Sequence, residues 1–125
     1  MNAGQHILCA AMAVASITVV SGCANTLYDW GRYELSVYEL YSNEFDLQTN
    51  LEVLTQEVKE TRDGGGVVPP GKMAHIGYLH SLAGNVEAAV RSFEAEKAAF
   101  LESAVFMDFL IAKIEVKRPE DRETP

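Results

Sequence analysis

Apolar side chains recur at steps of three and four residues along most of the chain, which is the spacing of one face of an α-helix. The clearest run is Leu47, Leu51, Leu54 and Val58, which predicts an amphipathic helix ending near Arg62. No segment alternates between apolar and polar residues with a period of two, as a half-buried strand would. The pattern therefore predicts an all-α domain.

Four further segments show the helical spacing. Their markers are, in chain order, Leu27, Trp30, Val37 and Tyr41 after a cap at Thr26; Met73, Ile76, Gly77 and His80; Ala89, Val90, Phe93 and Phe100; and Val105, Phe106, Phe109, Leu110 and Ile114. Asn43 is the predicted N-cap of the second helix. The glycines and prolines of residues 63–71 predict a loop before the third. We therefore expect about five helices.

The N-terminal segment has a different character from the rest of the chain. Residues 1–22 contain no Asp, Glu, Lys or Arg, and the 14 residues from Ile7 to Val20 are almost wholly apolar. Such a run is short for a transmembrane helix and suits an export signal. "VSGC", which ends at Cys23, has the form of a bacterial lipobox. We expect residues 1–22 to be a lipoprotein signal peptide and Cys23 to be lipidated; a plain secretory signal or an N-terminal anchor helix are the alternatives.

The two ends of the mature chain carry further signals. Ala24 follows the lipidated Cys, where Asp would favour retention in the inner membrane, so the sequence favours an outer-membrane protein on the periplasmic side. Residues 117–125, "KRPEDRETP", contain two prolines and no apolar residue, which predicts a disordered tail. The helical domain is therefore expected to span residues 23–116.

The charge balance excludes some classes of partner. The chain has 18 acidic and 10 basic residues and a formal net charge of −8. A nucleic-acid-binding protein needs clustered Lys and Arg to neutralise phosphates, and docking on an anionic membrane surface needs them too. Neither role fits this composition.

Residues 73–101 resemble a tetratricopeptide repeat in the spacing of their packing residues. The matching positions are Ile76-Gly77, Gly84-Asn85 at the turn, and Ala89 and Phe93. His80, Glu96 and Leu101 depart from the repeat, which usually has Tyr, Ala and Pro there. The resemblance implies antiparallel helical pairs, and because one repeat cannot bury its own face, the other helices must supply its neighbours.

The mature chain as a whole resembles a family of short bacterial lipoproteins called domain of unknown function 4810. The resemblance rests on the lipobox, on "LYDWGRYE" at residues 27–34, and on the blocks "AHIGYLHSLAGN" and "EKAAFLESAVFMDFL". It implies a helical, repeat-like lipoprotein of the outer membrane. It also implies neighbours in a shared envelope assembly: a lipoprotein resembling the curli-secretion pore protein, and a second small lipoprotein.

The sequence offers no catalytic or metal-binding motif. His75 and His80 are five residues apart and point about 140° apart on a helix, so they cannot chelate one ion together. Glu94, Glu96, Glu102 and Asp108 are scattered, and we expect solvated faces. No Ser lies in a nucleophile elbow, and Cys23 is expected to be acylated. We therefore expect neither an enzyme nor a cofactor.

The aromatic segment at residues 27–41 is the remaining candidate site. On a helix, Trp30, Val37, Tyr38 and Tyr41 fall on one side, which predicts a core stripe, whereas Tyr28 and Tyr33 point elsewhere. Exposed Tyr is typical of protein interfaces.

These residues lead to a functional expectation. We expect Tyr28 and Tyr33, with the groove histidines His75 and His80, to form a partner-binding surface of a lipid-anchored adaptor or assembly factor. A glycan-binding or small hydrolytic lipoprotein of the cell wall is the alternative, since aromatic rings stack on sugars. A structural spacer without a specific partner is a third possibility.

Overall fold

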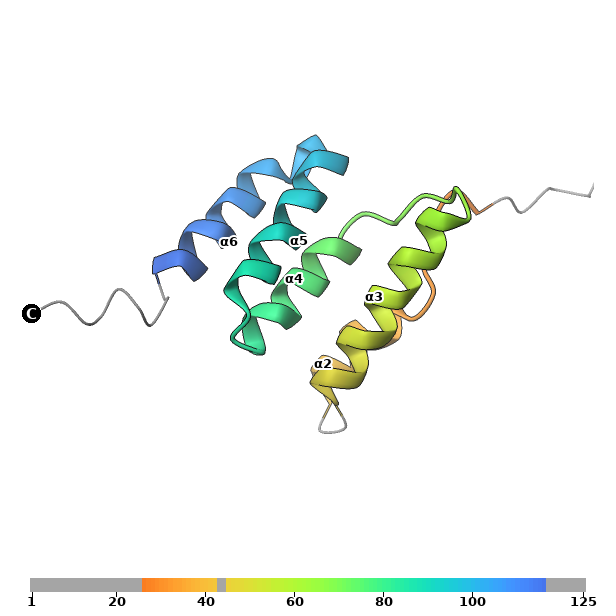
Figure 1. The fold of residues 1–125 in the computed structure, drawn as a ribbon, viewed down its shortest axis with the longest axis horizontal. Helices are drawn as coiled ribbons and strands as arrows, with labels where there is room; N and C mark the ends of the chain where they lie inside the picture. Colours follow the sequence, from red (N-terminus) through yellow and green to blue (C-terminus); the bar gives the residue numbers. More distant parts are fainter. Residues whose placement is uncertain (1–25, 43–44, 117–125) are drawn as a thin grey trace, which may run out of the picture.

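The computed structural model describes residues 26–42 and 45–116, and Figure 1 shows their arrangement. The elements are α2 (Tyr33–Leu40), α3 (Leu47–Asp63), α4 (Lys72–Leu82), α5 (Val86–Ala99), a single 3-10 turn η2 (Leu101–Ser103) and α6 (Ala104–Val116). The prediction of an all-α domain with five α-helices is confirmed for these residues. The predicted signal peptide (1–22), the lipidation site Cys23 and the predicted tail (117–125) lie outside the described residues.

The helices follow one another in space much as they do in sequence. Helix α4 packs against both α3 and α5, and α5 packs against α6, so that α6 forms one end of the row (Figure 1). Helix α2 lies beside α3 and is joined to it by polar contacts. Within the described residues, no helix has the length and apolar content needed to cross a bilayer.

Polar side chains define where the longer helices begin. The Asp46 carboxylate accepts a hydrogen bond of 2.8 Å from the Thr49 amide and caps α3. Asp46 therefore takes the role that the sequence had assigned to Asn43, which lies outside the described residues. The Asn85 side chain caps α5 in the same way, accepting from the Ala88 amide at 3.1 Å. Such caps satisfy amides that have no partner inside the helix.

The core consists of two clusters, one on each side of α4. The first joins α3 to α4 through Leu51, Leu54, Val58, Ile76 and Leu79. The second joins α5 to α6 through Ala89, Phe93 and Met107. Between them, α4 and α5 approach closely because Gly77 has no side chain. A β-carbon there would lie only 2.7 Å from Cε1 of Phe93. Phe93 on α5 therefore packs directly against α4 at Gly77.

The predicted first helix is wrong in its start and in its buried face. Helix α2 begins only at Tyr33, and three members of the predicted core stripe are exposed: Trp30 by 39%, Tyr38 by 73% and Tyr41 by 86%. Gly31 explains the late start, because it adopts φ = +48° and its α-carbon faces the Glu57 carboxylate, where a β-carbon would clash. The left-handed turn interrupts the helix, so a helical projection carried through Gly31 misplaces Trp30. Within α2 the inward face is that of Ser36, with Tyr33 and Leu40, and not that of Tyr38 and Tyr41.

Candidate functional site

A groove of about 870 Å³ is bordered by three helices of the described structure. Its walls come from α2, α4 and α6, and η2 with the end of α5 closes one side. The lining residues are Tyr33, Val37, Leu40, Tyr41, Pro70, Gly71, Ala74, His75, Tyr78, Glu96, Phe100, Glu102, Ser103, Phe106, Met107 and Leu110. Most of these side chains are apolar or aromatic. A groove of this kind can bury apolar groups of a partner.

The packing around the groove explains why it is preformed. Met107 on α6 is 2% exposed and belongs to the α5–α6 core cluster, with Ala74 and Leu110 packed beside it. On the opposite wall, Tyr33 and Leu40 pack against the α3–α4 cluster. The groove therefore lies between two separate cores, and each wall is anchored in one of them.

Two of the four predicted partner-binding residues meet at this groove. The rings of Tyr33 and His75 lie 5.6 Å apart, and Nε2 of His75 lies 3.0 Å from Oγ of Ser36 on α2. Burial lowers the pKa of the His75 imidazole. Burial, and then the negative charge of Glu96, raise the pKa of the Tyr33 hydroxyl. Both groups are therefore held neutral at physiological pH.

The helical projection predicted that Tyr33 would point away from the core, but Tyr33 contacts the core. It is half-buried, it packs against the α3–α4 cluster, and its ring stacks on Trp30 at 6.0 Å. The projection failed because Trp30 and Tyr33 lie on either side of the turn at Gly31. Tyr33 is part of a groove wall, not a free surface patch.

The other two predicted residues lie elsewhere. Tyr28 meets Trp30 edge-on at 6.0 Å and borders a smaller hollow of about 410 Å³ with Val67. His80 borders a third hollow between α3 and the end of α4, beside Gln48. Burial, and the positive charge of Arg91, lower its pKa. Neither residue reaches the groove.

Glu96 forms part of the groove and was missed by the sequence reasoning, which placed it on a solvated face. It is 2% exposed, and its carboxylate accepts hydrogen bonds from the backbone amides of Gly71 at 2.6 Å and Ala74 at 3.4 Å. These amides open α4, where a negative charge is favourable. The signal in the sequence was an acid at the helical spacing of Phe93 and Phe100, inside an apolar stripe.

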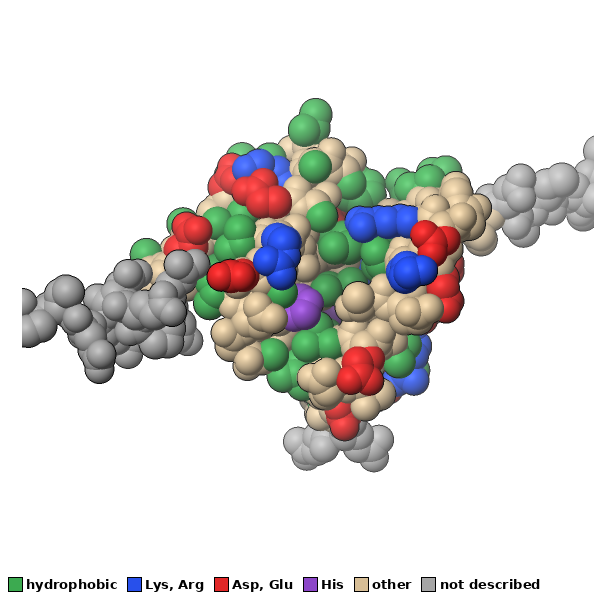
Figure 2. Space-filling view, viewed as in Figure 1, with side chains coloured by type: hydrophobic (Ala, Val, Ile, Leu, Met, Phe, Trp, Pro, Cys, Tyr) green, Lys and Arg blue, Asp and Glu red, His purple; other side chains and the backbone are tan. Residues whose placement is uncertain are grey.

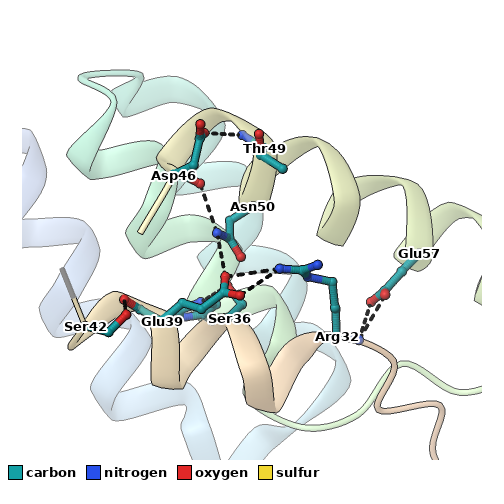
Figure 3. A network of polar contacts seen from close by, with 9 residues as sticks. Arg32, Ser36, Glu39, Ser42, Asp46, Thr49, Asn50 and Glu57 are labelled. Atoms are coloured by element: carbon teal, nitrogen blue, oxygen red, sulfur yellow. Dashed lines mark hydrogen bonds and ion pairs between the residues drawn. The ribbon is translucent and has the colours of Figure 1, made fainter. Parts of the chain in front are cut away.

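A buried ion pair fixes the start of α2 against α3 and α4. Lys72 is fully buried, and its Nζ lies 2.9 Å from Oε2 of Glu57. The same carboxylate accepts from the Arg32 amide at 2.9 and 3.1 Å. Figure 3 shows that the Arg32 side chain then turns to Glu39, to which Asn50 on α3 also donates. This polar network was not predicted, and it positions the groove wall that α2 supplies.

The described residues contain no group of three or more His, Cys, Asp or Glu side chains placed to hold a metal ion. Three of the four carboxylates considered from the sequence have partners of other kinds. Asp108 pairs with Lys97 at 2.6 Å, and Glu94 lies 3.4 Å from the same Lys97. Glu96 caps α4. These three carboxylates therefore have structural partners in the described residues.

A family model matches the whole part of the chain that lines the groove. The family is described as Domain of unknown function (DUF4810), and its model matches residues 27–110. Every groove-lining residue falls within that range. No curated protein and no solved structure matches the chain.

Proposed function

The chain belongs to the family described as Domain of unknown function (DUF4810), and we propose that it is a non-enzymatic adaptor or assembly factor that binds a protein partner in the groove between α2, α4 and α6. The single observation that carries the proposal is the groove itself. It is about 870 Å³ in volume, it is lined mainly by apolar side chains, and both its walls are anchored in the core.

The lining also indicates what the groove can hold. Apolar grooves between helices accept an amphipathic segment of a partner, whose apolar side chains fill the groove while its polar side faces water. Tyr41 and Tyr78 stand at the rim, exposed by 86% and 43%. Such rings offer a rigid apolar surface with a polar tip, which is typical of residues that contribute strongly to binding.

We further propose that the adaptor is anchored by lipid on Cys23 to the periplasmic side of the outer membrane. The lipobox "VSGC" supports this anchor. Two partners to test first are those that the family resemblance implies: the lipoprotein resembling the curli-secretion pore protein, and the second small lipoprotein. Replacing Cys23 by Ser should abolish labelling by radioactive palmitate. A wild-type chain that takes up no palmitate would contradict the anchor.

Photo-crosslinking in the native envelope tests the groove. A photoreactive amino acid at Tyr41 or Tyr78 should give a protein adduct, whereas the same group at Tyr38 should not. Tyr38 is the matched control because it is an exposed Tyr of α2, at 73%, that does not line the groove. Equal adducts at Tyr38 and Tyr41, or none at either groove position, would contradict the proposal.

Substitution gives the matching energetic test. Tyr41→Glu should weaken recovery of the crosslinked partner by about tenfold, which corresponds to about 1.4 kcal/mol for one rim residue. Tyr38→Glu should leave recovery unchanged. Both positions are exposed, so both variants should keep the melting temperature of the parent within the small range of surface substitutions.

The aromatic cluster supports a second candidate function, the binding of cell-wall glycan. Trp30 stacks on Tyr33 with an interplanar angle of 9°, and Tyr28 meets Trp30 edge-on. An exposed Trp face can stack on a sugar ring. Sedimentation with purified peptidoglycan separates the two functions. Retention of the wild-type chain and its loss in Trp30→Ala would favour glycan binding.

A further inference from the structure

Helix α6 carries more apolar surface than its own fold uses. Of its 13 residues, "AVFMDFLIAKIEV", only Asp108, Lys113 and Glu115 are charged. Helices of globular proteins usually have one apolar stripe that faces the core, and a helix that is apolar all round is buried on all sides. α6 is the last helix of the described row and packs against α5 (Figure 1).

One face of α6 is accounted for by the core. Met107 is 2% exposed, and Leu110, Ile111 and Ile114 pack around it in the α5–α6 cluster. These positions lie together on one side of the helix at 100° per residue. The opposite side is therefore free of the core of the described chain.

That opposite side carries a second apolar stripe, which we call the outer seam. It consists of Val105, Phe109, Ala112 and Val116, and Val105 and Val116 are exposed by 85% and 81%. The steps between the four residues are four, three and four. This is the spacing of the seam along which two helices pair in a coiled coil. Apolar side chains also reach the surface over α6 in Figure 2, beside acidic ones.

The charges beside the outer seam indicate what pairs with it. Asp108 lies along one edge of the seam and Lys113 along the other, five residues further on. In two parallel helices in register, a residue on one edge faces the residue five positions later on the other helix. Two copies of α6 would therefore bring each Asp108 to Lys113 of the second copy. Asp108 and Glu115 lie along the same edge of the seam. An antiparallel pair would place this acidic edge against the acidic edge of the second copy, where the charges repel.

Both side chains are exposed and can reach a second copy. Nζ of Lys113 lies over the ring of Phe109, 5.4 Å from the ring centre. The Lys113 side chain is therefore already directed towards the seam. Oδ1 of Asp108 is held at 2.6 Å by Lys97, which leaves Oδ2 for a second cation. We propose that two copies of this chain pair in parallel along the outer seam of α6. This goes beyond partner binding in the groove and does not rest on it.

Disulfide trapping in the full chain tests the pairing and its direction. Val105→Cys and Ala112→Cys should each link to the same position of the second copy under mild oxidation. Thr55→Cys, at an exposed position of α3, is the matched control. Mass spectrometry of the linked peptides distinguishes these bonds from any formed by Cys9 or Cys23. In an antiparallel pair Ala112→Cys would face Phe109 of the second copy, and no disulfide could form there. The absence of links at both positions, or links no stronger than at Thr55→Cys, would overturn the proposal.

Sedimentation of the full chain in a mild detergent gives the strength of the pair. The seam is short, so we expect a dissociation constant on the order of 1–100 μM. Val105→Glu should raise the dissociation constant at least tenfold, because the pair would then bury an unpaired charge. Val67→Glu, in an exposed loop, should leave the dissociation constant unchanged. Lys113→Glu should raise the dissociation constant at low salt, and this effect should disappear at high salt.

The two proposals fail separately. Val105→Glu should leave the photo-crosslinks at Tyr41 unchanged, since Val105 does not line the groove. A chain that is monomeric at all concentrations would overturn the pairing of two copies. So would a Val105→Glu variant that keeps the self-association of the parent but loses the photo-crosslink to another protein.

Discussion

Removing the charge of Glu57 should destabilise the chain more than any single surface change. Lys72 has no exposed side-chain surface, and Glu57 is its partner at 2.9 Å. Glu57→Gln keeps the shape of the side chain, and its amide oxygen can still accept from the Arg32 amide. The Lys72 ammonium would nevertheless remain buried without an anion, which costs about 3–5 kcal/mol. This is a large part of the 5–15 kcal/mol by which typical domains are stable.

The reverse change should cost less. Lys72→Met fills the same space with an apolar chain, and it leaves Glu57 with two advantages. The Glu57 side chain is 23% exposed, so water can solvate it, and it keeps the hydrogen bonds from the Arg32 amide. We expect a loss of about 1–2 kcal/mol for Lys72→Met. The double variant should lie close to Lys72→Met, because the buried charge is then gone.

Urea unfolding of the four chains, followed by circular dichroism, measures this cycle. The order of stability should be parent, then Lys72→Met and the double variant together, then Glu57→Gln. If Glu57→Gln is itself unfolded without urea, refolding in the double variant still reports the rescue. A loss below about 1 kcal/mol for Glu57→Gln, or a double variant as unstable as Glu57→Gln, would refute the assignment of Lys72 as a charge that depends on Glu57.

Three further changes test other parts of the fold. Phe93→Ala should lower the free energy of unfolding by about 3–5 kcal/mol, because Phe93 is 1% exposed against Gly77; an unchanged melting temperature would contradict that packing. Asn85→Ala should cost about 1 kcal/mol through the lost cap of Ala88, whereas Asn85→Asp should keep most of it. Burial lowers the pKa of His75. The free energy of unfolding should therefore be highest above pH 6.5 and should fall as the pH drops from there towards the lowered pKa. In urea unfolding measured across pH, His75→Asn should flatten this dependence.

The helices that the sequence predicted well are those whose apolar spacing is uninterrupted. Leu51, Leu54 and Val58 lie in the core of α3 as their spacing required. For residues 73–101, the resemblance to a tetratricopeptide repeat placed Gly77 and Phe93 among the packing positions, and the two residues do meet. Apolar spacing failed before Tyr33, where a single glycine in a left-handed conformation changes the direction of the chain. Nothing in the apolar pattern distinguishes Gly31 from a glycine inside a helix.

The polar part of the site was less accessible to sequence reasoning for a different reason. Glu57 with Lys72, and Glu96 with the Gly71 amide, are 15 and 25 residues apart. Hydrophobic spacing reports which side of a helix faces inward, but it does not report which carboxylate meets which donor. The same limit separated Tyr33 and His75, which the sequence named as candidates on different helices and the fold brings to one groove.

The way in which α2 is attached has a consequence for local opening. Of its eight residues only Ser36 is fully buried. Tyr33 and Leu40 pack at the edge of the α3–α4 cluster, and three directed contacts complete the attachment: Ser36 with His75, Glu39 with Asn50, and Glu57 with the Arg32 amide. Hydrogen bonds of this kind are lost within a small displacement, whereas apolar contacts can slide. α2 should therefore release as a unit, with its amides exchanging hydrogen for deuterium at a lower opening free energy than those of α4 and α5. One wall of the groove would then act as a latch that opens while the α4–α5 pair stays folded.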